Sequence, residues 1–290
     1  MSHKEFAHWL RKHPYLLVVG LFLLIDILLL LPTLFAHPTL RVSFLNVGQG
    51  DAVFIEAPNG NQILYDSGPP SGATLRELSR LMPFWDRSID VAVLSHPDLD
   101  HIGGFPEVFK RYEVSAVLEP GATSANGVYD AVQVAIRDER AAHIYAKRGM
   151  QIVLGGGVVL DVLYPEHDMS GSETNSASIV LRVRYGATAF LLSGDLPQAQ
   201  EEYVAKEFGS GLRAEVLKLG HHGSRTSTSP YWLSAVMPDT VVISAGKNNR
   251  YGHPHKEVIE LLEDKKIPML VTFEEGTITF ESDGETVTRI

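Results

Sequence analysis

The fold and the chemistry of this chain are decided by the stretch Ser95-His96-Pro97-Asp98-Leu99-Asp100-His101-Ile102-Gly103-Gly104. It directly follows the apolar run Val91–Leu94, which is typical of a buried β-strand. Four imidazole and carboxylate side chains occur within six residues, and these groups commonly bind divalent metals. A polar loop that caps a helix near Ile102 would explain one of them alone. The whole cluster at a strand end favours a metal site.

Two later segments repeat this design, in which a strand runs into a glycine and a side chain of the metal-ligand type. Thr188–Ser193 runs into Gly194 and Asp195, and Ala214–Leu219 runs into Gly220 and a His-His pair. Asp66 also follows a strand, and we expect it to orient a ligand. The candidate metal ligands are therefore His96, Asp98, Asp100, His101, Asp195, His221 and His222.

The composition limits the kinds of site that this chain can build. Of its 290 residues, 44% are hydrophobic and 21% are charged, as in ordinary globular proteins. The chain has no cysteine, which excludes disulfides, thiol catalysis and zinc sites made of thiolates. The net charge of −10 argues against the broad basic face of a general nucleic-acid binder, so any contact with phosphates must be local.

The segment Tyr15–Ala36 is apolar apart from Asp26. At about 1.5 Å per residue it reaches about 30 Å, enough for one bilayer crossing. Basic residues outnumber acidic ones before it, so the positive-inside rule predicts a cytoplasmic amino terminus. A cleaved signal peptide is the alternative, but residues 34–36 are a poor cleavage site. We expect a single-pass protein of a bacterial-type cell membrane, with a short cytoplasmic segment 1–14, a transmembrane anchor 15–36 and an extracytoplasmic domain 37–290.

Short β-rich runs alternate with helical patterns from residue 40 onward. The first series predicts strands at 40–46, 52–57, 62–66, 89–95 and 116–119, and helices at 74–81, 106–111 and 125–140. The second predicts strands at 152–154, 158–164, 179–185, 188–193, 216–219, 240–244, 269–273 and 277–281, and helices at 198–208 and 256–265. Two such sets predict an α/β fold in which two sheets pack face to face with helices outside, a four-layer αββα sandwich.

These motifs, in this order, resemble the metallo-β-lactamase fold, which has a histidine-rich first motif, a bridging Asp and a late His. More narrowly, the chain resembles the extracytoplasmic domain of ComEC competence proteins throughout 40–290. The motifs that carry the narrower resemblance are Val47-Gly48-Gln49-Gly50-Asp51-Ala52, His221-His222-Gly223-Ser224 and Asn249-x-Tyr251-Gly252-His253-Pro254-His255. The resemblance implies metal-dependent cleavage of single-stranded DNA outside the membrane. Proteins of the ComEC type also carry a membrane channel, so it implies a separate DNA-channel protein as a partner.

The chain departs from the general family pattern in informative ways. Asp98 stands where the general fold has a second His, and the His expected before the bridging Asp is absent from Thr174–Ser178. An oxygen-rich site makes Mn²⁺ a rival to Zn²⁺, and either one or two ions would fit. His222 is the better counterpart of the late ligand, and His221 could fill the vacancy. Asn46 replaces a usual Asp, which affects only a supporting residue.

The expected mechanism is attack on a phosphodiester by a metal-bound hydroxide. Asp100 would orient the attack or accept a proton, and His253 would contact the substrate or the leaving group. Ser224, Tyr251 and His255 are candidate substrate-binding residues, with Tyr251 stacking on a base. Basic residues near these motifs could neutralise phosphate or simply lie on solvated faces: Lys218, Arg225, Lys247, Arg250 and Lys256.

Three functions are compatible with the sequence. The first is a membrane-anchored phosphodiesterase that acts as a nuclease on single-stranded DNA. The second is a hydrolase of the same fold that acts on a small substrate, either a phosphocholine ester or a β-lactam. The third is a non-catalytic, membrane-tethered partner in DNA uptake.

Overall fold

A computed structural model describes residues 9, 12–35 and 39–290 of the chain, with the side chains of 28–35 excepted. The chain divides into two compact units, Met1–His37 and Pro38–Ile290. The first contains helix α2 (Pro14–Phe35), on which large apolar side chains such as Leu17 and Phe22 are exposed. Among the described residues, no helix has the length and apolar character needed to cross a membrane. Residues 1–8, 10, 11 and 36–38, which include most of the predicted cytoplasmic segment and the end of the predicted anchor, lie outside the described residues.

Two mixed sheets form the framework of the second unit within its described residues. The first sheet runs in the order β15-β14-β1-β2-β3-β4-β5-β6. Its strands are β1 (Leu40–Phe44), β2 (Val53–Glu56), β3 (Gln62–Tyr65), β4 (Ser88–Val93), β5 (Glu113–Glu119), β6 (Ala142–Tyr145), β14 (Ile278–Ser282) and β15 (Val287–Arg289). The second runs in the order β13-β12-β11-β10-β9-β8-β7. Its strands are β7 (Gln151–Gly155), β8 (Val158–Tyr164), β9 (Val180–Tyr185), β10 (Thr188–Leu192), β11 (Val216–Lys218), β12 (Thr240–Ile243) and β13 (Met269–Val271).

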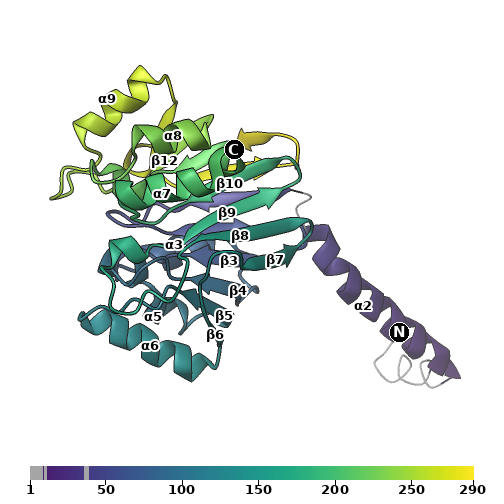
Figure 1. Cartoon of the computed structure of the whole chain (residues 1–290). Helices are drawn as coiled ribbons and strands as arrows, with labels where there is room; N and C mark the ends of the chain where they lie inside the picture. Colours follow the sequence, from purple (N-terminus) through teal and green to yellow (C-terminus); the bar gives the residue numbers. More distant parts are fainter. Residues whose placement is uncertain (1–8, 10–11, 36–38) are drawn as a thin grey trace. The chain divides into compact units, whose positions relative to one another are not determined.

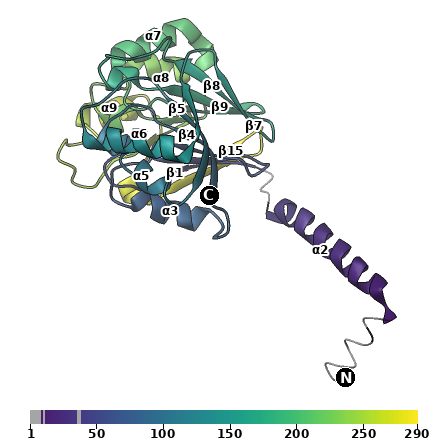
Figure 2. The ribbon, with the colours of Figure 1, turned by 90° about the horizontal axis from the view of Figure 1, so that it is seen from below.

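Helices cover the outer faces of both sheets. On the first sheet lie α3 (Ala73–Leu81), α4 (Leu99–Ile102), α5 (Phe105–Val108) and α6 (Gly127–Glu139); Figure 2 shows α3, α5 and α6 in front of this sheet. On the second lie α7 (Gln198–Phe208), α8 (Pro230–Val236) and α9 (Lys256–Asp264), on the opposite side of the unit from α5 and α6 (Figure 1). Short turns complete the set: α10 (Thr272–Glu275) and the 3₁₀ turns η1 (Asn175–Ala177), η2 (Gly209–Leu212) and η3 (Gly220–Gly223).

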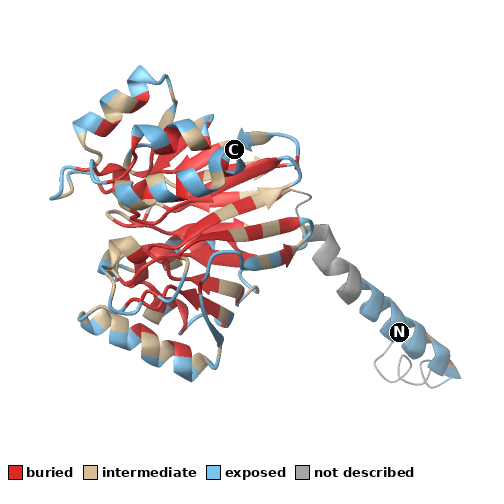
Figure 3. Cartoon of the chain, viewed as in Figure 1, coloured by how far each residue is buried: buried red, intermediate tan, exposed pale blue. Residues whose placement is uncertain are grey.

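The apolar cores follow these layers. Phe44, Phe190 and Phe280 belong to a core that joins side chains of both sheets. Trp232 lies in a core between the second sheet and its helices, and Phe105 lies in a core between the first sheet and its helices. Figure 3 shows both sheets as mostly buried and the helices as exposed on their outer sides. The predicted α/β fold with two packed sheets is confirmed.

The strand assignments differ from the predicted series at four places. β14 was predicted within the second series, but it joins the first sheet by antiparallel pairing with β1. This pairing spans almost the whole domain, so no local pattern indicates it. The edge strand β6 and the short strand β15 are not predicted. β6 is exposed throughout and lacks an alternating apolar pattern, and β15 has only 3 residues, too few to show such a pattern. The strand predicted at 269–273 ends at Val271, where α10 begins.

Strand direction brings the sequence motifs to one place. β3, β4 and β5 run parallel, as do β10, β11 and β12, and the carboxyl ends of parallel strands meet at one edge of a sheet. The motif loops leave β4, β10 and β11 at these ends. Backbone hydrogen bonds join the loops: Ile179 N donates to Ser95 O at 2.9 Å, and His221 N donates to Gly194 O at 3.2 Å. Glycine is required at position 50, because a Cβ there would lie 2.2 Å from Asp100 O.

Candidate metal centre

The imidazoles of His96, His101 and His222 converge on the carboxylate of Asp195. Asp195 Oδ1 lies 3.2 Å from His101 Nε2, and Asp195 Oδ2 lies 3.5 Å from His222 Nε2 and 4.0 Å from His96 Nε2. All four residues are buried. The three Nε2 atoms and Asp195 Oδ1 have no hydrogen-bond partner among the described residues. Buried polar atoms are normally satisfied, and a divalent cation would satisfy these.

The other ring nitrogen of each imidazole is held from behind. His101 Nδ1 lies 2.8 Å from Asp66 Oδ2, and His222 Nδ1 lies 2.9 Å from the carbonyl oxygen of Ser244. His96 Nδ1 lies 3.0 Å from Ser95 Oγ. A hydrogen bond donated from Nδ1 leaves a lone pair on Nε2, which is the arrangement of metal-binding histidines. The residues present therefore fit a divalent metal ion.

Asp66 is itself fixed by its neighbours. The backbone N–H of Ser95 donates to Asp66 Oδ1 at 2.8 Å, and the Ser95 hydroxyl donates to Oδ2 at 2.7 Å. Asp66 adopts a φ of 59°, a left-handed conformation that is uncommon outside glycine. The Asp66 side chain thus reaches His101 Nδ1 from the end of β3.

The loop after β11 adopts a left-handed turn. His221 and His222 have φ angles of 50° and 55°, and such strain in non-glycine residues clusters at functional sites. His222 is buried, whereas the His221 side chain is 26% exposed and places Nε2 3.6 Å from Asp195 Oδ2. The Nδ1 atom of His221 lies 3.0 Å from Thr226 Oγ1. His221 therefore lies at the rim of the cluster.

Asp98 and Asp100 occupy the open side of the cluster. Asp98 Oδ2 lies 3.7 Å from His96 Nε2, and Asp100 Oδ2 lies 3.2 Å from His222 Nε2. Their side chains are 36% and 31% exposed, in contrast to the buried residues behind them. The structure thus brings all seven sequence-predicted ligands together, with the two aspartates on the partly exposed side.

Asp51 is a buried member of the cluster that was not assigned a role from the sequence. Its Oδ1 lies 3.3 Å from His222 Nδ1, its Oδ2 lies 3.7 Å from His101 Nδ1, and Oδ2 also forms an ion pair with Lys218. Asp51, His101, Asp195 and His222 could together hold an ion, because their ligand atoms lie within 4.8 Å of one another. Asp51 faces the Nδ1 side of both rings, however, so we place it behind the metal position.

Lys218 corrects one of the sequence-based interpretations. It was a candidate for neutralising the phosphate of a substrate, but its side chain is 0% exposed. The ammonium group pairs with Asp51 and donates to the carbonyl of Leu219 at 3.0 Å. Its location in the short strand β11 places it in the interior, where it neutralises Asp51 and cannot reach a substrate.

Ser178 supports the cluster from the loop that lacks the family histidine. Its hydroxyl accepts a hydrogen bond from the backbone N–H of Asp195 at 3.1 Å and lies 3.4 Å from His96 Nδ1. A serine in a polar stretch carries no sequence signal for this role, because the contact joins the end of the η1 turn to the segment after β10.

The charges of the cluster shift the pKa of its imidazoles. Burial disfavours the charged form of His222, but the carboxylates of Asp195 and Asp51 outweigh burial and raise its pKa to about 10. Burial also lowers the pKa of His101, but the carboxylates of Asp195 and Asp66 outweigh burial and raise this pKa well above its usual value. Burial and the neighbouring His101 lower the pKa of His96 to about 3. The metal-free cluster therefore holds protons on His101 and His222 at neutral pH.

Metal affinity should consequently rise with pH. A cation binds the neutral imidazoles and must displace these protons, which become easier to remove as the pH rises toward their raised pKa values. We expect the affinity for Mn²⁺ or Zn²⁺ to rise by about tenfold per pH unit for each proton displaced, between about pH 6 and pH 9. Isothermal titration calorimetry in two buffers with different ionisation enthalpies measures the metal affinity and the number of protons released on binding. A pH-independent affinity without proton release would contradict the expectation.

Asn249 shapes the loop that carries the last motif. Its side-chain amide donates to the carbonyls of Gly246 and His253, and its Oδ1 accepts from the backbone N–H groups of Tyr251 at 3.1 Å and His253 at 3.0 Å. The His253 ring lies 6.1 Å from the His222 ring. Burial and the nearby His222 lower the pKa of His253 to about 4, so His253 is neutral at pH 7.

Ser224 and His255, two candidate substrate-binding residues, make contacts within the protein. Ser224 is buried, and its hydroxyl lies 3.0 Å from that of Thr226. His255 Nδ1 accepts a hydrogen bond from the backbone N–H of Arg225 at 3.1 Å. Both side chains organise the turn at 224–226, next to the His221 side chain.

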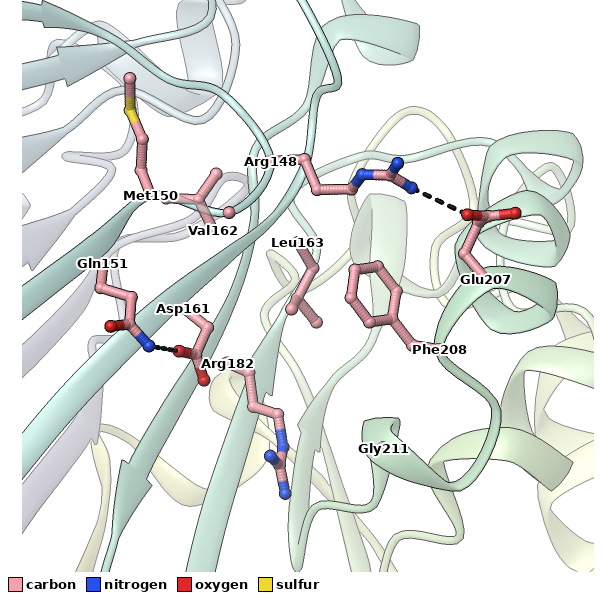
Figure 4. Close-up of a pocket in the computed structure, with 11 residues that line it drawn as sticks. Arg148, Met150, Gln151, Asp161, Val162, Leu163, Arg182, Glu207, Phe208 and Gly211 are labelled. Carbon is pink, nitrogen blue, oxygen red and sulfur yellow. Dashed lines mark hydrogen bonds and ion pairs between the residues drawn. The ribbon is translucent and has the colours of Figure 1, made fainter.

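Two cavities differ in their relation to this centre. One of about 400 Å³ includes Asp100 in its wall. Another of about 460 Å³ contains none of the predicted site residues. Figure 4 shows the latter, with the Arg148–Glu207 ion pair at 2.9 Å and the Gln151–Asp161 hydrogen bond at 2.7 Å.

Residues 45–247 match the family model described as the metallo-beta-lactamase superfamily. The chain is 34% identical to "ComE operon protein 3" of Bacillus subtilis, over 85% of this chain and 34% of that protein. It is 35% identical to "Recombination protein 2" of Haemophilus influenzae, over 85% and 29% of the two chains, and 34% identical to "Competence protein ComA" of Neisseria gonorrhoeae, over 82% and 32%. The chain thus spans about a third of the length of these curated relatives.

Solved structures with little sequence identity share the fold. The metallo-beta-lactamase fold protein YhfI from Bacillus subtilis aligns with a TM-score of 0.54 at 12% identity, over 84% of this chain and all of that chain. Zn²⁺-bound PqqB from Methylobacterium extorquens aligns with a TM-score of 0.53 at 10% identity, over 80% and 87% of the two chains.

Proposed function

This chain belongs to the metallo-β-lactamase superfamily, and from that premise we propose that it is a metal-dependent phosphodiesterase that cleaves single-stranded DNA. The observation that carries the proposal is the convergence on Asp195 of three buried Nε2 atoms that have no hydrogen-bond partner in the described part of the chain, beside two aspartates that open to solvent. The choice of DNA is supported by relatives named for competence and recombination.

His96, His101, His222 and Asp195 would hold the metal, with Asp98 and Asp100 on its open side. A divalent cation bound there would lower the pKa of a water molecule and polarise a phosphate oxygen. The mixture of imidazole and carboxylate ligands suits Mn²⁺ as well as Zn²⁺.

Asp100 and His253 are the residues of the chain that would act on the substrate. The imidazoles of His222 and His101 outweigh burial and hold the pKa of the Asp100 carboxylate well below its usual value, so Asp100 is ionised and can accept a hydrogen bond or a proton. His253 is neutral and its Nδ1 has no hydrogen-bond partner among the described residues. It can therefore hydrogen-bond to a leaving group without adding positive charge.

We further propose that residues 15–36 anchor the domain on the outer side of a bacterial cell membrane. The run of exposed apolar side chains on α2, from Leu17 to Ile27, supports this assignment. A DNA-channel protein is the proposed partner of the domain, which is supported by relatives named for competence and recombination.

The proposal predicts that the full chain, loaded with Mn²⁺, cuts a labelled single-stranded oligonucleotide and that Asp100→Ala loses this activity while keeping its melting temperature. Parallel assays use bis(p-nitrophenyl) phosphate, a choline phosphodiester and nitrocefin. If the chain hydrolyses a small diester but leaves the DNA intact, it is a small-substrate phosphodiesterase and not a nuclease. Hydrolysis of nitrocefin would indicate a lactamase. A metal-loaded chain that binds DNA but hydrolyses none of these would be a non-catalytic partner.

A further inference from the structure

A cavity of about 400 Å³ adjoins the metal centre through Asp100, and this volume lies within the range of small-molecule sites. Its walls include Gln49, Pro69, Leu99, Asp100, Arg250 and Tyr251. Leu99 and Tyr251 are large apolar side chains that are 45% and 47% exposed. The cavity therefore offers apolar surface directly beside the proposed reaction site.

Tyr251 is held ready for a planar ligand. Its backbone is fixed by Asn249, and its ring stacks on His253 with centroids 5.6 Å apart. The Arg250 guanidinium lies 4.8 Å from the centroid of the Tyr251 ring and donates to the tyrosine hydroxyl. The guanidinium therefore lies over the ring, at a position that a planar base could take. Since Arg250 is exposed, it can leave the ring and pair with a phosphate.

Gln49 adds a polar group to the same cavity. Its Oε1 accepts a hydrogen bond from the backbone N–H of Gly246 at 3.1 Å. This contact fixes the orientation of the amide, because a flipped amide would place its NH₂ group against the N–H group of Gly246, and both are donors. The Nε2 atom of Gln49 is buried and has no hydrogen-bond partner among the described residues. An acceptor atom on the edge of a nucleobase would satisfy this donor.

We propose that this cavity is a nucleobase subsite, which takes an unpaired base of the strand next to the phosphate being cleaved. The inference rests on the proposed function. Tyr251 stacks on the base, Leu99 packs against it, and Gln49 Nε2 donates to its edge. A base within a duplex is stacked on its neighbours and paired, so it cannot enter without first being unpaired. The subsite thus accounts for a preference for single strands.

The test compares a fluorescein-labelled oligothymidylate with a strand of the same length that carries abasic tetrahydrofuran residues. Fluorescence anisotropy measures binding to the full chain in EDTA, so that no strand is cut. The wild type should bind the oligothymidylate about tenfold more tightly than the abasic strand, as stacking on an aromatic side chain implies. Tyr251→Ala should lose most of this difference. Gln49→Glu, which keeps the acceptor for Gly246 but removes the donor, should reduce it.

Tyr231→Ala is the matched control, because Tyr231 is 48% exposed, lies on α8 and is not in the wall of this cavity. It should keep the full preference for bases. Equal binding of both strands by the wild type, or a full preference in Tyr251→Ala, would overturn the subsite. If the wild type cleaves DNA and Tyr251→Ala keeps the full preference for bases, the subsite assignment is wrong and the nuclease assignment stands. A base preference that depends on Tyr251 in a chain that cuts no DNA would keep the subsite and remove the nuclease.

Discussion

Asp195→Asn should abolish metal binding and metal-dependent hydrolysis while the domain stays folded. Asp195 is the carboxylate on which the Nε2 atoms of His96, His101 and His222 converge, and a neutral amide of the same size cannot replace its charge. A bound metal contributes several kcal/mol to the stabilisation of a transition state, so the rate should fall by about a thousandfold or more. Elemental analysis of the purified protein and the rate of hydrolysis give the two measurements.

The matched control for this variant is Asp239→Asn, since the Asp239 side chain is 65% exposed and lies outside the cluster. It should bind metal and turn over substrate as the wild type does. If Asp195→Asn keeps its metal content and loses less than about threefold in rate, the assignment of the metal position is wrong. Circular dichroism of both variants shows whether a loss of activity is caused by unfolding.

Lys218→Met should destabilise the domain by about 2–3 kcal/mol, less than the cost of a fully unpaired buried charge, because His222 Nδ1 and His101 Nδ1 remain 3.3 Å and 3.7 Å from Asp51. Neither Lys218 nor Asp51 has exposed side-chain surface. Methionine fills a similar volume, so the loss reports on the charge of Asp51 and not on packing. Urea denaturation of the metal-free protein measures the change in the free energy of unfolding.

A double-mutant cycle separates the ion pair from other effects of the substitution. Asp51→Asn in the Lys218→Met background removes the remaining buried charge, so the double variant should recover much of the lost stability. Lys256→Met is the matched control, because Lys256 is exposed and its ion pair with Glu260 lies on the surface of α9; no measurable change is expected there. Additive losses in the cycle would show that Asp51 and Lys218 are not energetically coupled.

Most of the candidate metal centre was predictable from the sequence, because its residues follow strands. His96, Asp98, Asp100 and His101 lie in one short segment that runs from the end of β4 into α4. The pattern of an apolar run followed by glycine and ligand-type residues recurs after β10 and β11. Parallel pairing aligns such ends within each sheet, and the face-to-face packing of the two sheets brings the segment after β4 to those after β10 and β11. The layers of the fold were predictable for the same reason, since each strand and helix has its own periodicity.

The sequence by itself determined the two-sheet α/β fold and the supply of imidazole and carboxylate ligands at strand ends. Only the tertiary structure decided which groups face solvent and which face the interior. It buried Lys218 against Asp51, paired β14 with β1 at the far end of the chain, and brought Gln49 and Tyr251 into the wall of one cavity with Asp100. These outcomes depend on contacts between residues distant in the chain, and local propensity carries no information about such contacts because packing and desolvation act on the assembled sheets.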